Sequence, residues 1–73
     1  MNGLQYAEFE LYRNEKTWYS LTAFFKGYGF TLQIRDLDTG EVVFTKFLRT
    51  KSTEYCGNYL RKVVKNNFNA RPA

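Results

Sequence analysis

The chain has 73 residues, enough for one domain with a small core, so we expect residues 1–73 to fold as a single domain. One cysteine excludes an internal disulfide, and no apolar run approaches the roughly 20 residues that span a membrane. We therefore expect a cytoplasmic protein that binds no membrane. Because histidine is lacking, the commonest general base is missing, and we expect no enzyme activity, no catalytic residue and no cofactor.

The charge is +4 overall but is unevenly distributed along the chain. Residues 1–45 carry more acidic than basic side chains, whereas residues 46–73 carry seven basic side chains and one acidic one, Glu54. Such a basic segment attracts phosphate groups or an acidic protein, or it is a solvated helix face that keeps the protein soluble.

Two alternating segments predict a first hairpin, with strands at about residues 4–12 and 17–25. We expect a loop at residues 14–16, which pairs Phe9 with Leu21 and Leu11 with Tyr19 and leaves Tyr12 and Trp18 on the opposite face. Lys26-Gly27 then predicts a second tight turn, because glycine adopts the positive φ that such loops require.

The next strands are predicted at about residues 28–37 and 41–49, joined by a turn over Asp38-Thr39-Gly40 with a bulge at the glycine. This register pairs Ile34 with Phe44 and points Val42, Phe44 and Leu48 inward. It also places Lys46 on the inner face, where the side chain could reach water at the edge of the sheet.

A helix is predicted at about residues 53–67, with Ser52 as its N-cap and an end near Asn66-Asn67. Its apolar stripe contains Cys56, Leu60 and neighbouring residues, and we expect residues 68–73 to be a loose tail. The fold class is thus α+β, a four-stranded antiparallel up-and-down sheet with one C-terminal helix packed on one face (ββββα). Phe9, Leu21, Phe30, Leu32, Ile34 and Phe44 should be buried beneath Leu60 and Val63.

Two local patterns invite a chemical interpretation, and both have a simpler structural one. Cys56 lies on the apolar stripe of the helix, which favours a buried, inert thiol over a nucleophile. Asp36-Leu-Asp38-Thr-Gly40-Glu41 is similar to the start of a calcium loop, but its glycine is one position too early. We therefore expect no metal site.

The string Lys26-Gly-Tyr-Gly-Phe30 resembles the first ribonucleoprotein motif of RNA-recognition-motif and cold-shock domains, in which two aromatic rings bind bases. In the RNA-recognition motif the strand continues with apolar residues at the positions where this chain has Thr31 and Gln33. The parity of Phe30, Leu32 and Ile34 instead places the rings on the buried face. We therefore favour a glycine hairpin over a base-binding motif.

The sheet face opposite the helix carries the better functional signal. The expected register places Tyr12, Trp18, Arg35 and Val43 in one row and Tyr6, Phe24, Gly29 and Arg49 in another, with Phe47 between them. Aromatic and arginine side chains on an uncovered sheet bind unpaired bases, pair across strands, or form a protein interface. The candidate binding residues are Tyr12, Trp18, Phe24, Arg35, Phe47, Arg49 and Lys51.

Four strands followed by one helix, with Leu32-Gln-Ile-Arg-Asp-Leu37 in a central strand, resembles the single-stranded-DNA-binding cofactors of the positive cofactor four type. We hypothesise a small non-catalytic protein that binds single-stranded DNA or RNA. The alternative is a protein–protein interaction module, such as a viral or mobile-element inhibitor of a host enzyme or defence complex, acting in the host cytoplasm. A homodimer is compatible with either hypothesis.

Overall fold

The computed structural model describes residues 5–73, with side chains from residue 10 onward, and has an α+β fold. The predicted burial of the Phe9 side chain and the predicted strand start at Leu4 lie outside the described residues. The elements are β1 (Gln5–Arg13), β2 (Trp18–Phe25), β3 (Phe30–Asp36), β4 (Val42–Leu48), α1 (Thr53–Phe68) and β5 (Arg71–Pro72).

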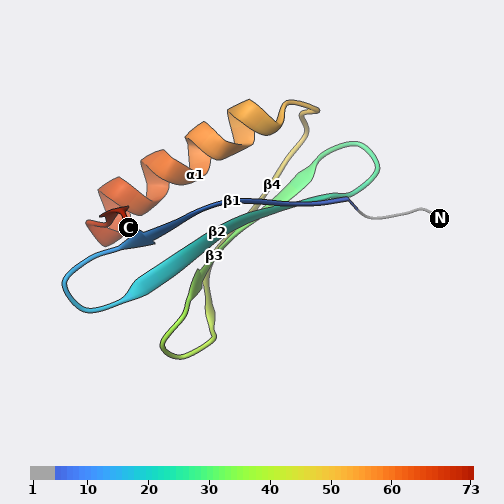
Figure 1. Cartoon of the computed structure of the whole chain (residues 1–73). Coiled ribbons are helices and arrows are strands. Elements are labelled where there is room, and N and C mark those ends of the chain that lie inside the picture. The colour runs from blue at the N-terminus through green and yellow to red at the C-terminus, as the bar shows by residue number, and fades with distance from the viewer. Residues whose placement is uncertain (1–4) are drawn as a thin grey trace.

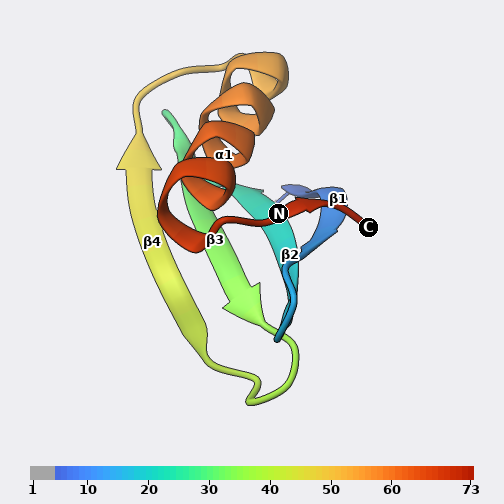
Figure 2. The same cartoon turned by 90° about the vertical axis from the view of Figure 1, so that its left-hand side faces the viewer.

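All neighbouring strands are antiparallel, and their order in the sheet is β4-β3-β2-β1-β5. The helix lies along one side of the twisted sheet and leaves the other side uncovered (Figures 1 and 2). This is the predicted arrangement with one added strand. No helix in residues 5–73 has the apolar length that crossing a membrane requires.

The core lies between α1 and the sheet. Leu60 and Val64 of the helix are fully buried together with Leu21, Leu32 and Ile34 of the central strands, and Phe30 is nearly so. Phe44 and Val63 are partly buried against this cluster. Leu21, Phe30, Leu32 and Ile34 are thus buried as predicted, and Phe44 is only partly buried.

The helix begins and ends as its sequence dictates. The Ser52 hydroxyl accepts a hydrogen bond from the Tyr55 backbone N–H, which caps the first turn as predicted. The C-cap is Asn69, with φ of 54°, so an asparagine does adopt the left-handed conformation, slightly later than the predicted Asn66-Asn67.

The C-terminal tail was predicted to be loose, and this prediction is wrong. Ala70 is buried, and Arg71–Pro72 pairs with β1 opposite Arg13 and Tyr12. The Ala73 N–H also donates to the Leu11 carbonyl at 3.1 Å. The edge of β1 offers unpaired backbone groups that the turn after Asn69 brings within reach of the tail.

A bulge in β1 changes which side chains face the helix. Ala7 pairs with Ala23 as predicted, but the register shifts between Glu8 and Glu10, so Glu10 pairs with Leu21 and Tyr12 with Tyr19. One extra residue exchanges the two faces for the rest of a strand. Tyr12 is consequently buried, 2% exposed, and Leu11 is 43% exposed, the reverse of the prediction.

The β2–β3 register differs from the prediction by two residues. Phe25 pairs with Phe30, so the loop is residues 26–29 and not Lys26-Gly27 alone. A shift of two residues keeps every side chain on its predicted face but changes its neighbours. Arg35 therefore lies beside Ser20, and Trp18 lies beside Leu37, whose N–H donates to the Trp18 carbonyl.

The β3–β4 register confirms the pairing of Ile34 with Phe44 and places Lys46 opposite Leu32. Gly40 has the expected positive φ of 81°, but a further irregularity at Val43 makes Arg35 pair with Val42. Val42 therefore belongs to the open face, contrary to the prediction that it points inward.

Candidate functional site

The candidate site is the sheet face that α1 does not cover, which we call the open face. Cross-strand pairing places on it Leu11, Arg13, Trp18, Ser20, Thr22, Phe24, Thr31, Gln33, Arg35, Val42, Thr45 and Phe47. From Leu11 onward, the charged side chains on this face are arginines, and the pairing of Glu8 with Thr22 gives the face one acidic position as well. The face thus offers apolar, hydroxyl and amide groups together with positive charge.

At one end of the open face, Trp18 is the centre of an exposed apolar group. Trp18 is 42% exposed, and Leu37 and Val42 are exposed to a similar degree. The Arg13 guanidinium lies over the ring, 5.7 Å from its centroid, which is a cation–π distance. An open hollow of about 400 Å³ adjoins Trp18, and Glu10, Leu11, Pro72 and Ala73 also line it. We call this group the Trp18 end.

At the opposite end, Tyr28 in the β2–β3 turn is 65% exposed. The Tyr28 and Phe47 rings meet edge to face, with 5.3 Å between their centroids. The Arg49 guanidinium lies 5.5 Å from the centroid of the Tyr28 ring. Because Phe47 belongs to the open face, this cluster extends that face beyond the ends of the strands. We call Tyr28, Phe47 and Arg49 the Tyr28 end.

The turn that presents Tyr28 depends on two glycines for different reasons. Gly27 has φ of 68°, which a side chain would strain. A Cβ on Gly29 would collide with the Leu48 carbonyl oxygen and lie 2.6 Å from Phe47 Cζ. Phe30 is buried in the core against Phe25 as predicted, which leaves the string Lys26–Phe30 without a second base-binding ring. Tyr28 is exposed, contrary to the prediction that both rings of the string lie on the buried face.

The predicted site residues fall into three groups. Trp18, Phe24, Arg35 and Phe47 lie on the open face, and Arg49 joins it through Tyr28. Lys51 is exposed in the segment between β4 and α1. Tyr12 is not part of this face, because the bulge in β1 turns it toward the helix, and it is removed from the candidate site.

Leu11, Arg13 and Tyr28 were missed by the sequence reasoning. The bulge that brings Leu11 and Arg13 to the open face leaves no mark in the alternation of residues 4–12. For Tyr28, the flanking glycines were a signal for a longer turn, in which the ring would not follow strand parity.

Tyr12 belongs to a polar cluster on the helix side. Burial raises the pKa of its hydroxyl, and the Glu10 carboxylate raises the pKa further. Glu10 accepts a hydrogen bond from Arg61 Nε at 3.0 Å, which joins β1 to α1. The positive charge of Arg61 thus lies on the side opposite the open face.

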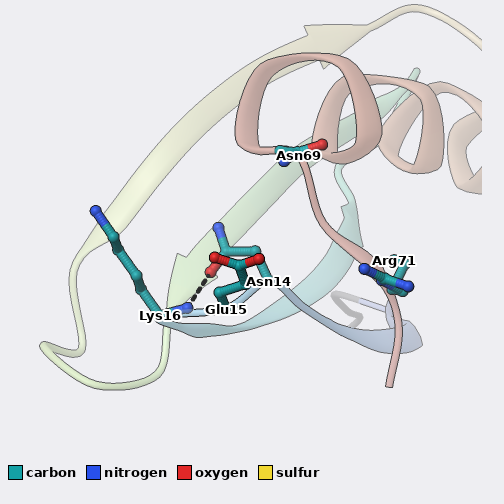
Figure 3. A pocket seen from close by; sticks show the side chains of 5 residues that line it. All are labelled: Asn14, Glu15, Lys16, Asn69 and Arg71. Atoms are coloured by element: carbon teal, nitrogen blue, oxygen red, sulfur yellow. Dashed lines mark hydrogen bonds between the residues drawn. The ribbon is translucent and has the colours of Figure 1, made fainter.

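A second hollow lies between the β1–β2 loop and the residues after α1 (Figure 3). Asn14 lines it, but the Asn14 side chain donates to the Phe68 carbonyl at 2.8 Å and accepts from the Lys16 and Thr17 N–H groups. The other lining residues mix both charges, with Glu15, Lys16 and Arg71. Asn14 therefore acts as a structural bridge between the loop and the end of the helix.

No thiol or carboxylate in the described region is arranged for evident chemistry. Cys56 is fully buried, and burial raises the pKa of its thiol. The Asp36 carboxylate accepts from the Asp38 and Thr39 N–H groups and so organises its own turn. Within the described residues, no three His, Cys, Asp or Glu side chains gather as metal ligands.

Comparison of the chain with family models, with curated proteins and with solved structures finds no match.

Proposed function

We propose that this protein binds single-stranded nucleic acid on the open face and catalyses no reaction. The observation that carries the proposal is the pairing of an exposed aromatic ring with an arginine at both ends of the face, Trp18 with Arg13 and Tyr28 with Arg49. Rings that stack on bases, beside cations that neutralise phosphates, are the two elements of single-strand binding without sequence preference.

The roles of the residues follow from their chemistry. Trp18, Phe47 and Tyr28 offer exposed ring surface for stacking, and Phe24 adds a half-buried ring. Arg13, Arg35, Arg49 and Lys51 are the candidate phosphate contacts. Gln33 and Thr45 lie between the two ends, and Thr31 lies beside Phe47; all three offer hydrogen-bonding groups to bases or sugars.

Titration with a twelve-nucleotide oligothymidylate tests this proposal. Trp18 is the only tryptophan, so its fluorescence should be quenched when a base stacks on it. Trp18→Ala should weaken binding about 5- to 150-fold, since one stacked base contributes roughly 1–3 kcal/mol. Affinity should also fall with salt, with a logarithmic slope of about −0.7 for each phosphate neutralised.

Matched controls separate the open face from the general basic charge of the protein. Tyr55 is an exposed tyrosine of α1, and Lys65 is an exposed cation in the last turn of α1. Tyr55→Ala and Lys65→Ala should leave the affinity nearly unchanged. A lack of binding by any oligonucleotide near physiological salt would refute the proposal.

A protein interface is the second candidate, and the apolar group around Trp18 favours it. Leu11, Trp18, Leu37 and Val42 are each about 40% exposed, and exposed apolar groups of this kind mark interaction surfaces. A partner could be a host enzyme or defence complex, or a second copy of this chain. Under this hypothesis oligonucleotides leave Trp18 fluorescence unchanged, whereas Trp18→Ala abolishes binding of a purified protein partner or self-association in sedimentation.

A further inference from the structure

The Trp18 end and the Tyr28 end are far apart on one continuous face. Phe24, Thr31 and Phe47 form one cross-strand row, and Trp18 lies six residues before Phe24 in β2. Strand geometry then gives a separation of about 20 Å along the strands and about 10 Å across them, or about 22 Å between Trp18 and Phe47. A single base cannot contact both ends.

The region between the two ends carries polar side chains. Ser20 and Thr22 are small and buried between neighbouring side chains, and Gln33 and Thr45 lie in the same row as Thr22. No large ring occupies this middle part among the described residues. A ligand that bridges the two ends would therefore cross it with hydrogen-bonding contacts and without stacking.

We propose that the open face is a two-part site that binds one nucleic acid strand along the β2–β3 hairpin, with a base at each end. This inference rests on the proposed function and adds the length and the path of the ligand. The hollow beside Trp18, of about 400 Å³, falls within the size range of ligand pockets and would take one base with its sugar. The second base would stack on Tyr28 or Phe47.

Charge complementarity favours a nucleic acid strand as the ligand. Each ring is accompanied by its own arginine, and Arg35 lies on the face between the rows of Trp18 and Thr22. A strand presents a base and a phosphate at every nucleotide, so it supplies the same pair of groups repeatedly. A second copy of this chain would place arginines against arginines, which is unfavourable.

The distance between the ends sets a minimum ligand length. Stacked nucleotides advance by about 3.4 Å each, so a stacked trimer spans about 7 Å from its first to its last nucleotide. An extended trimer with twice that advance per nucleotide spans about 14 Å. A trimer therefore reaches one end only. Eight nucleotides span about 24 Å even when stacked, enough to reach both ends, and the second contact then becomes intramolecular.

The experiment compares three- and eight-nucleotide oligothymidylates on the intact protein by calorimetry and Trp18 fluorescence. An octamer contains about six overlapping three-nucleotide segments, so it should bind about sixfold tighter than the trimer even at a one-part site; we call this the counting factor. At a two-part site the octamer should bind more than tenfold tighter than the trimer. Trp18→Ala and Tyr28→Ala should each weaken octamer binding about 5- to 150-fold. In either variant the length advantage, meaning the ratio of octamer affinity to trimer affinity, should shrink to the counting factor.

Controls and opposing outcomes are well defined. Trp18→Phe and Tyr28→Phe keep a stacking ring and should retain most of the length advantage, and Tyr55→Ala on α1 should retain all of it. If trimer and octamer both bind but differ only by the counting factor, the two-part site is overturned and the proposed function stands. If neither binds, even at low salt, both proposals fail. If only a protein partner binds, both proposals fail and the open face is the protein interface of the second candidate function.

Discussion

Replacement of Gly29 by alanine should destabilise the protein through a collision that no rotamer change relieves. The added Cβ would overlap the Leu48 carbonyl oxygen, which is backbone, and lie 2.6 Å from Phe47 Cζ. Either the end of β4 or the β2–β3 turn must move away. Because Leu48 pairs with Phe30 in the core, this movement also disturbs buried contacts.

The magnitude follows from the kind of contact. Overpacking of this sort costs about 1–3 kcal/mol, and the higher end is expected where the obstacle is backbone. Small domains have low overall stability, near the bottom of the usual range of about 5–15 kcal/mol. Gly29→Ala should therefore lower the urea midpoint strongly and leave a measurable unfolded fraction.

Gly27 in the same turn is the matched control. Its φ is 68°, but no atom lies within 4 Å of a Cβ built there. Gly27→Asn should cost less than about 1 kcal/mol because asparagine tolerates positive φ, whereas Gly29→Asn should be worse than Gly29→Ala. Urea unfolding followed by Trp18 fluorescence and circular dichroism measures all three variants. Equal costs at the two glycines would refute the packing argument.

Three further results are expected. Leu60→Ala removes a fully buried side chain of α1 and should cost about 2–5 kcal/mol in urea unfolding; a cost below about 1 kcal/mol would contradict the packing of α1 on the sheet. Cys56 should react with a thiol reagent only at the rate of unfolding, because its thiol is buried and has a raised pKa; rapid labelling of the native protein would contradict this. Burial and Glu10 raise the pKa of Tyr12 above the unfolded value near 10. Tyr12 should therefore favour folding fully below pH 10 and progressively less as pH rises through the higher folded-state pKa. In urea unfolding, Tyr12→Phe should flatten this loss of stability above pH 10.

The faces of the central strands could be predicted from the sequence because their side-chain alternation is strict. Leu21, Leu32 and Ile34 are buried as predicted, and Trp18 and Arg35 are on the opposite side. The helix could likewise be predicted, because Ser52 and the stripe from Cys56 to Val64 are local signals. The part of the candidate site on β2, β3 and β4 was therefore accessible from sequence alone.

Only the tertiary structure decided the neighbours of these residues. The extra residue at the β1 bulge and the two-residue shift between β2 and β3 leave most of the alternation intact, so periodicity cannot reveal them. Burial of Tyr12 under the helix, next to Tyr19, accompanies the bulge and turns Arg13 toward Trp18. The expected pairing of Trp18 with Arg35 was wrong because of the two-residue shift between β2 and β3, which places Arg35 beside Ser20.

The fifth strand and the hollow beside Trp18 also arise from long-range contacts. Nothing in residues 68–73 predicts a strand, because two residues carry no periodicity, and their pairing depends on the free edge of β1. The sequence thus determined which residues are apolar, which turns need glycine and where the helix begins. The register of the strands, set by packing against α1 and by loop closure, decided which rings and arginines meet on the open face.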